Sequence, residues 1–327
     1  MKKPPDAWIS AMRAGSFERA WTLADAAIAA RDPATRDDPR EPYHRRWIWD
    51  GRAFDGRDVV ARCYHGLGDT IQYARFLPPL ARRARSLTVE VQPRLLPLLE
   101  PLVPGARWVG FRPTHPIAHG EVDIGITELD HALRMRPDLP AVPYLQAAPA
   151  VLPAGTIALC NGAGDWDAER SLPADLLAPL SKLAPCVTLM PGPSALPVLN
   201  PEGCPLDMAA TAALVAGVSL VVTVDTMIAH LAGALGRPVW LMLKAEPDWR
   251  WNPASRRSHW YPTARLYAQP RPDDWGSVVA AILADLKEER AHGPAIDPAR
   301  PRLLGGVARQ ADDPRHQARA AGAARSA

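Results

Sequence analysis

The chain has 327 residues, 47% of them hydrophobic, and its 38 Lys and Arg against 35 Asp and Glu give a formal net charge of +3. This is the composition of a globular protein of two or three domains, and the small charge gives no reason to expect a nucleic-acid partner. The four cysteines are widely spaced and form no Cys-x-x-Cys pair, which argues against a zinc or iron site and fits a reducing cytoplasm.

Residues 1–46 predict a short helical segment followed by a linker. The first five residues are basic, but no long apolar run follows them, so we expect neither a signal peptide nor a transmembrane helix. Over residues 6–30 the large apolar side chains fall at helical spacing, broken by Gly15 and Ser16, which indicates two short helices. The pair resembles one degenerate tetratricopeptide unit, and because one repeat cannot bury its own apolar face, it should pack on the next domain. Residues 31–46 are polar and interrupted by prolines, as a linker would be.

Residues 47–150 and 151–291 each alternate strand and helix patterns, which predicts an α/β fold with two Rossmann-like domains joined near residues 143–145. In the first domain we expect strands at 58–63, 87–92, around 108 and at 122–126, and helices at 69–83 and 93–102. In the second we expect strands at 156–160, 186–190, 220–224 and 239–243, and helices near 173–183, 208–216, 226–235 and 274–289. Residues 292–327 are rich in Ala, Arg, Pro and Gly and should form a disordered tail.

The most informative stretch joins two apolar runs through Asp225, Thr226 and a helical pattern that contains His230. It predicts strand, turn, helix and strand, with Gly236 in the left-handed position after the helix. Asp225 and Thr226 then lie at the carboxyl end of the strand and the amino end of the helix. Open α/β sheets bind ligands at that edge, and the free N–H groups and dipole of the helix attract phosphate there.

These residues resemble the signature of the heptosyltransferase-like glycosyltransferases, glycosyltransferase family nine: Asp-Thr, a His soon after, and a small-residue helix ending in Gly-x-Pro. Residues 64–76, YHGLGDTIQYARF, are similar to the Gly-x-Gly-Asp turn at the first strand of that family. Residues 247–251, PDWRW, followed by WYP at 260–262, resemble the branch that carries tetratricopeptide helices before the transferase. The resemblance runs from about residue 47 to about residue 286, with one motif in each predicted domain.

The resemblance implies the two-domain architecture called GT-B, in which a cleft lies between the carboxyl ends of the two sheets. It implies an inverting, metal-independent transfer of a heptose or related sugar from a nucleotide-sugar donor to a glycan, lipid or protein acceptor, with no cofactor. No His cluster and no Cys pair lies near either motif, so we expect no metal site. The enzyme should be cytoplasmic, and a pI of about 8.7 is compatible with peripheral contact with the inner face of the membrane.

Asp69 is the candidate for the catalytic base. It follows Gly66 and Gly68, whose lack of side chains leaves the carboxylate free to face the cleft, and both glycines are included among the donor-binding candidates. In the family the matching Asp is implicated as the base that takes the proton of the acceptor hydroxyl. The alternative is a plain helix cap, which would keep Asp69 ionised but make it a weaker base.

The resemblance places the donor diphosphate at Asp225, Thr226 and His230. Thr226 can donate its hydroxyl, and the N–H groups that follow it can hold a phosphate oxygen. Asp225 is itself an anion, so it would fix the loop or bind a sugar hydroxyl instead. The alternatives are a strand-to-helix cap and, for His230, a buried helix histidine.

Arg170, Trp249 and Arg250 complete the donor-site candidates. The family often carries a basic residue near Arg170 that neutralises the leaving diphosphate, and a guanidinium fork suits that task. The alternative is a solvated loop arginine beside Glu169. Trp249, Arg250 and Trp251 form an aromatic and cationic cluster that would either stack on a base or sugar or pack against the domain interface.

Two segments depart from the family pattern. Residues 190–194, MPGPS, contain no carboxylate where heptosyltransferases usually carry an acidic residue for the nucleoside ribose, so the resemblance does not specify ADP-heptose as the donor. Residues 125–131, GITELDH, replace a Ser-Leu-Pro that is usual in the tetratricopeptide branch. Because the amino-terminal domain sets acceptor choice, the identity of the acceptor does not transfer.

Two other functions compete with sugar transfer. A catalytically degenerate GT-B scaffold would bind partners through its amino-terminal helices, although the intact Asp69 and Asp225-Thr226 motifs argue against it. An NAD-dependent oxidoreductase would share the Rossmann pattern. However, no Gly-x-Gly-x-x-Gly opens a helix after a first strand with an acidic residue beyond it.

Overall fold

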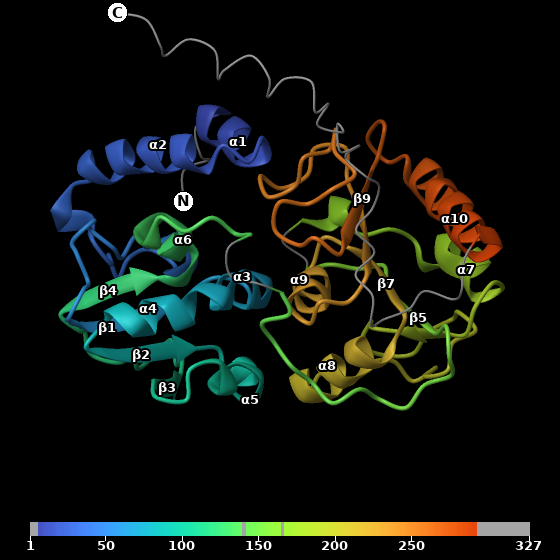
Figure 1. Cartoon of the computed structure of the whole chain (residues 1–327), viewed down its shortest axis with the longest axis horizontal. Helices are drawn as coiled ribbons and strands as arrows, with labels where there is room; N and C mark the ends of the chain where they lie inside the picture. Colours follow the sequence, from blue (N-terminus) through green and yellow to red (C-terminus); the bar gives the residue numbers. More distant parts are fainter. Residues whose placement is uncertain (1–5, 139–141, 165–166, 293–327) are drawn as a thin grey trace, which may run out of the picture.

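The computed structural model describes residues 6–138, 142–164 and 167–292, and in this part of the chain two parallel sheets stand side by side with a pair of helices across one end (Figure 1). The predicted fold class, an α/β chain with a short helical segment at its amino end, is confirmed. The predicted disordered tail lies outside the described residues, except for His292 at its start.

The first sheet has the order β3-β2-β1-β4, and all its neighbouring strands are parallel. Its strands are β1 (Asp58–Arg62), β2 (Ser86–Val91), β3 (Arg107–Gly110) and β4 (Val122–Gly125). Its helices are α3 (Leu67–Tyr73), α4 (Leu77–Arg83), α5 (Leu96–Leu99) and α6 (Leu129–Leu133). Because Val59 pairs with both Leu87 and Val122, β1 is a central strand, and the Gly-rich turn that follows it opens at the carboxyl edge of the sheet.

The second sheet has the order β6-β5-β7-β8-β9 and is also parallel throughout. Its strands are β5 (Ile157–Cys160), β6 (Cys186–Thr188), β7 (Leu220–Val224), β8 (Val239–Leu243) and β9 (Ala264–Ala268). Its helices are α7 (Ala178–Ser181), α8 (Met208–Gly217), α9 (Met227–Ala234) and α10 (Trp275–His292). The predicted strand, turn, helix and strand around Asp225 is confirmed as β7, α9 and β8, and Gly236 has the left-handed φ of 67° expected after a helix.

Three predicted helices are wrong in their continuity, and prolines explain each case. The helix expected at 69–83 is α3, a 3-10 turn at Ala74–Phe76, and α4, which begins with prolines in its first turn. The helices expected at 93–102 and 173–183 are likewise divided into 3-10 turns and the four-residue helices α5 and α7. Proline lacks the N–H that a helix interior needs, but it is tolerated in a first turn, so the chain restarts a helix at each proline.

Strand β9 was not predicted. Its sequence, ARLYA, is short and contains a charged Arg265, so it lacks the continuous apolar run by which the inner strands were identified. It lies at the edge of the second sheet, where it pairs with β8, and Arg265 forms an isolated antiparallel bridge with Arg257. The half-buried Arg265 side chain forms ion pairs with Asp285 and Glu289 of α10, which compensate its charge.

The helical pair, α1 (Asp6–Arg13) and α2 (Phe17–Ala29), confirms the two predicted helices. The pair packs on the first half, as expected, and it also packs on the second half, which was not predicted. Met12, Phe17 and Trp21 are buried in one apolar cluster that includes the first sheet and also Trp260 of the second half. A second cluster fills the opposite face of the second sheet, under α10. The pair is therefore part of a core that runs through both halves.

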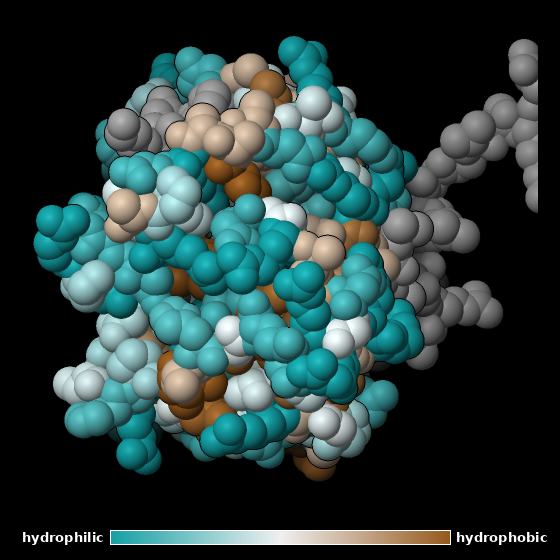
Figure 2. Space-filling model, turned by 90° about the vertical axis from the view of Figure 1, so that its left-hand side faces the viewer, coloured by the Kyte–Doolittle hydropathy of each residue, from teal (hydrophilic) through white to brown (hydrophobic). Residues whose placement is uncertain are grey.

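The predicted linker, residues 31–46, contains two 3-10 turns, Pro33–Thr35 and Tyr43–Arg45. A hydrogen bond from the Tyr43 hydroxyl to the Pro113 carbonyl connects it to the first half. The face of the molecule beside this segment is largely hydrophilic, with small separate apolar patches (Figure 2). Among the described helices, none is both long enough and apolar enough to cross a membrane.

Candidate active site

The two motifs meet where helix α3 of the first half crosses helix α9 of the second. Both helices begin at the carboxyl edge of a sheet, α3 after β1 and α9 after β7. At the crossing, a Cβ added to Gly68 would lie 2.9 Å from Cδ2 of His230 and 3.3 Å from Cα of Met227. Gly68 is therefore required for the close approach of the two helices, and its predicted contact with the donor stays a prediction.

Asp69 lies at this crossing, where its carboxylate both caps α3 and contacts the second half. Its Oδ2 accepts a hydrogen bond of 3.0 Å from the backbone N–H of Gly66, the residue that caps α3, so the capping role is confirmed. Its Oδ1 accepts from the guanidinium of Arg250, which is 181 residues away in the chain. The side chain keeps 26% of its surface exposed, so the carboxylate can still be reached from solvent.

The charge state of Asp69 follows from two opposed effects. Burial raises the pKa of the carboxyl, because the charged form loses hydration. The Arg250 guanidinium, followed by His65 and His230, outweighs this effect and holds the pKa of Asp69 below its usual value. Asp69 is therefore ionised at neutral pH, which a base requires, although the lowered pKa makes it a weak one.

Arg250 connects the two halves at the site. Its Nε donates to Oε1 of Gln72 on α3 at 2.6 Å, and its Nη1 donates to Oδ1 of Asp248 in its own loop at 2.8 Å. The Cζ atom lies 4.3 Å from the centre of the Trp249 ring. The guanidinium thus joins a helix of the first half to the loop after β8, and Gln72 and Asp248 are contacts that sequence reasoning did not anticipate.

At the end of β7, the backbone of Asp225 is held by Arg170, whose Nη1 donates to the Asp225 carbonyl at 2.7 Å. The Asp225 side chain is buried, and burial together with the neighbouring Asp248 raises its pKa to about 6 against the opposing effect of Arg170. Thr226 occupies the cap position of α9, but its side chain makes no capping hydrogen bond. The Thr226 hydroxyl is thus not committed to a cap, and it lies beside the first-turn N–H groups of α9.

His230 is buried in α9, as expected if it is a packed helix histidine rather than a donor-binding residue. Its Nδ1 lies 3.1 Å from the hydroxyl of Tyr261, and its ring stacks on Trp251 at 5.7 Å between centroids. Burial, reinforced by the charge of Arg250, lowers the pKa of His230 to about 3, so the ring is neutral at physiological pH. Trp251 is also fully buried, which assigns it to packing, whereas Trp249 is only half-buried.

Arg170 is buried, so it is not the solvated loop arginine of the alternative interpretation. It ends a 3-10 turn after β5, and its Nε lies 3.7 Å from Asp167. Lys244, which was not predicted, directly follows β8 and places its Nζ 3.0 Å from Asp167 and 2.9 Å from Glu169. A basic residue immediately after a buried strand is a sequence signal that could have identified it.

Asp167 also ends the triplet Asp165-Trp166-Asp167, an Asp-x-Asp spacing whose two carboxylates can in principle share a divalent cation. The first two residues of the triplet lie outside the described part of the chain. Within that part, no three His, Cys, Asp or Glu side chains are grouped closely enough to hold a metal ion.

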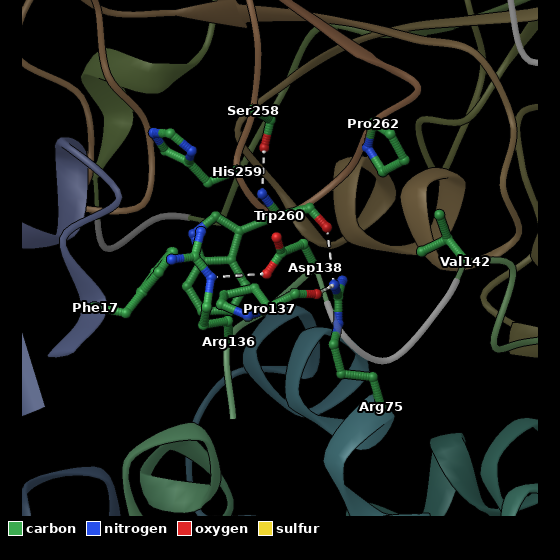
Figure 3. A pocket seen from close by; sticks show the side chains of 10 residues that line it. All are labelled: Phe17, Arg75, Arg136, Pro137, Asp138, Val142, Ser258, His259, Trp260 and Pro262. Atoms are coloured by element: carbon green, nitrogen blue, oxygen red, sulfur yellow. Dashed lines mark hydrogen bonds and ion pairs between the residues drawn. The ribbon is translucent and has the colours of Figure 1, made fainter. Parts of the chain in front are cut away.

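A cavity of about 450 Å³ lies beside Arg75, near the end of the first motif, and is also lined by Phe17 of α2, residues 136–138, Val142 and residues of the loop 258–262 (Figure 3). Among the lining residues, Arg75 donates through its Nη1 to the carbonyls of Pro137 and Trp260, both at 2.8 Å. A second cavity, of about 770 Å³, opens at the amino ends of β1, β2 and β3. Neither is lined by the predicted site residues.

Comparison with known proteins supports the fold and part of the family assignment. Residues 204–270, which include the Asp225-Thr226 turn, His230 and Arg250, match the family model of glycosyltransferase family 9 (heptosyltransferase). No curated protein matches the chain significantly.

Two solved structures illustrate the similarity of fold. The iron-containing dodecameric glycosyltransferase TibC from enterotoxigenic E. coli H10407 superposes with a TM-score of 0.50 at 14% identity, covering 73% of this chain and 78% of that one. E. coli heptosyltransferase WaaC with ADP gives a TM-score of 0.49 at 13% identity, covering 72% of this chain and 98% of that one. At such identities the likeness concerns the fold alone. The match over residues 204–270 to the model of glycosyltransferase family 9 is what indicates a glycosyltransferase.

Proposed function

We propose that the protein is an inverting, metal-independent glycosyltransferase that moves a heptose or related sugar from a nucleotide-sugar donor to a glycan, lipid or protein acceptor. The observation that carries this proposal is the contact between Asp69 of the first half and Arg250 of the segment that matches family 9. It brings a reachable carboxylate to the helix terminus that suits a diphosphate. The domains would be the helical segment and linker 1–46, an acceptor domain 47–150 and a donor domain 151–291.

Asp69 is the proposed base. In the transfer, the acceptor O–H bond breaks and its proton passes to the Asp69 carboxylate. The acceptor oxygen forms a bond to the anomeric carbon from the face opposite the diphosphate, and the bond from that carbon to the phosphate oxygen breaks with its electron pair. A carboxylate has about four lone-pair positions, so the hydrogen bonds from Gly66 and Arg250 leave room for an acceptor hydroxyl.

The departing diphosphate would be held at the amino end of α9. The N–H groups of its first turn and the Thr226 hydroxyl are hydrogen-bond donors at a positive helix terminus. Arg170 fixes the turn through the Asp225 carbonyl and adds positive charge, and Lys244 places a second cation nearby, at Asp167. These groups can compensate the leaving-group charge without a divalent cation. Turnover that is abolished by EDTA and restored by magnesium or manganese would contradict metal independence.

Donor identity is the least specified part of the proposal. Residues 190–194, which follow β6, contain no carboxylate that could bind the ribose, so the site does not specify the nucleoside of ADP-heptose. Melting shifts with a panel of nucleoside diphosphates and dinucleotides would identify the class, since a ligand that binds only the native state stabilises it by RT ln(1 + [L]/Kd). A diphosphate preference supports the transferase, and a dinucleotide preference would support an oxidoreductase.

A catalytically degenerate scaffold is the second candidate, and one observation favours it. The ion pair with Arg250 lowers the pKa of Asp69, which reduces its strength as a base. Transfer assays with the nucleotide sugar of the best-binding nucleotide would separate the two candidates. Sugar transfer that is lost in Asp69→Asn supports the enzyme, whereas nucleotide binding without hydrolysis or transfer supports the scaffold. For the enzyme we propose a cytoplasmic location, with peripheral contact at the inner membrane face.

A further inference from the structure

The helical pair α1–α2 touches the segment that carries Arg250. The rings of Trp8 and Trp249 meet edge to face with centroids 4.9 Å apart, at an interplanar angle of 64°. Nη2 of Arg13 donates to the Pro247 carbonyl at 2.5 Å, two residues before Trp249. In Figure 1 the amino-terminal helices reach from above the first half to the loops of the second. The loop 246–251 is therefore held from outside by α1.

The other end of the pair is fixed to the first half. Nε1 of Trp21 donates to Oδ2 of Asp130 at 3.2 Å, in a buried position. Asp25 accepts from Arg134 at 2.5 Å and pairs with Nε2 of His131 at 2.8 Å. Because α2 is anchored on α6, it provides a fixed support from which α1 contacts the second half.

The Trp249 ring lies between this support and the site. One side contacts Trp8, and the Arg250 guanidinium lies over the ring with its Cζ 4.3 Å from the centroid. Arg250 in turn contacts Asp69 and Gln72 on α3. A continuous set of contacts thus runs from Trp8 through Trp249 and Arg250 to the candidate base.

We propose that Trp8 is a positioning residue for the transfer: it fixes the Trp249 ring, and through that ring it holds Arg250 against Asp69. The inference rests on the proposed function, because it assigns Trp8 to the site in which Asp69 acts. Trp8 touches neither substrate nor the reacting atoms and acts only through Trp249. The amino-terminal helices thereby become part of the catalytic arrangement rather than an appended module.

The consequence can be measured at the Asp69 carboxyl. The groups that face it are the charged Arg250 from the loop after β8 and two titratable histidines, His65 from the turn after β1 and His230 from α9, together with the Gly66 N–H. Loss of Trp8 removes one of the two rings that pack on Trp249, Trp260 being the other, and is expected to loosen the loop 246–251 and weaken the contact of Arg250 with Asp69. Burial then raises the pKa of Asp69 with less opposition, so its titration should move to higher pH.

The test uses Trp8→Ala in the full chain, with the Asp69 carboxyl followed by ¹³C NMR and assigned by its absence from Asp69→Asn. The matched control is Ile28→Ala, which removes a partly buried side chain from the same helical pair where it lies near Gly51 of the first half. Trp8→Phe keeps an aromatic edge against Trp249. We expect an upward shift of the Asp69 titration in Trp8→Ala, no shift in Ile28→Ala, and recovery in Trp8→Phe.

In sugar-transfer assays, the rate of Trp8→Ala should fall on the order of tenfold, and the acidic limb of its pH–rate profile should move in the same direction as the titration. An Asp69 titration that is unchanged in Trp8→Ala, or shifted equally in Ile28→Ala, would overturn the inference. A shifted titration in a protein that transfers no sugar in any variant would leave the positioning role intact and contradict the proposed function instead.

Discussion

Arg62 and Arg250 each contact two carboxylates, and they differ in which parts of the molecule those carboxylates belong to. Arg62, at the end of β1, donates to Glu90 on β2 at 2.7 Å and to Asp123 on β4 at 2.6 Å, so all three residues belong to one sheet. It also donates to the carbonyls of Ile117 and Ala118. Only 1% of its side chain is exposed.

Arg250 contacts Asp69 on one half and Asp248 on the other, and 11% of its side chain is exposed. Any change in the relative position of the halves changes these contacts, whereas the Arg62 cluster moves as part of its sheet. The comparison teaches that the same grouping of charges can stabilise a fold when it lies within one half. When it bridges two halves beside a reachable carboxylate, it can instead regulate chemistry.

The largest effect is expected when the Arg250 cluster loses its base. Asp69→Asn keeps the size and capping ability of the residue but cannot accept a proton. The rate of transfer should fall by roughly 10²–10⁴-fold while donor binding stays nearly normal. Single-turnover rates and isothermal titration of the nucleoside diphosphate check both parts. Normal turnover would remove Asp69 from the mechanism, and a failure to fold would make it a structural cap.

The Arg62 cluster should respond in stability instead. Arg62→Met leaves Glu90 and Asp123 buried without their cation, and breaking a buried ion pair costs about 3–5 kcal/mol. Urea unfolding should show that loss. Arg250→Met is the matched substitution at the other cluster. If it destabilises the protein as much as Arg62→Met does, the distinction between the two clusters is incorrect.

A smaller effect is expected at the second motif. Thr226→Val removes a hydroxyl with little change in shape, so donor affinity should fall by about 1–2 kcal/mol, the scale of one hydrogen bond to a charged group. Isothermal titration measures the loss. Because Asp69→Asn is expected to leave donor binding nearly normal, the double variant should bind the donor about as weakly as Thr226→Val alone. Unchanged affinity in Thr226→Val would move the diphosphate away from α9.

The smallest expected effect is on pH dependence. The pKa of His230 is lowered to about 3 by burial and by Arg250, so below the ordinary value of 6.5 the unfolded chain binds a proton that the native ring does not. The free energy of unfolding must therefore decrease as the pH is lowered, by about 0.7 kcal/mol from pH 7 to pH 6. Asp225 has the opposite sign, because its pKa is raised to about 6 in the native state.

The difference between wild type and His230→Gln isolates the histidine, since the Asp225 contribution is common to both proteins. Urea unfolding at pH 7 and pH 6 should show a steeper loss in the wild type. Equal losses in the two proteins would mean that His230 is protonated in the native state and that the Arg250 cluster does not exclude its charge.

Features that depend on local sequence patterns could be predicted, whereas contacts between residues far apart in the chain could not. Turns at Asp225 and Gly66 follow from apolar runs, glycines and caps, and these were predicted correctly. The contact between Asp69 and Arg250 could not be predicted from the sequence, because the residues are 181 positions apart and lie in different halves. Arg62 escaped notice for a related reason, since a single charged residue within the predicted strand 58–63 does not indicate a buried ion pair until its partners on neighbouring strands are known.

The course of the apolar core limits how the molecule can be recombined. It continues without interruption from α1–α2 through the first sheet to α9, and a single ring, that of Tyr261, occupies the space that a side chain at Gly233 would need. An exchange of one half for that of a related transferase would therefore cut through packed side chains rather than through a linker. A chimaera that exchanges the first half must therefore also include the helical pair and the facing surface of α9.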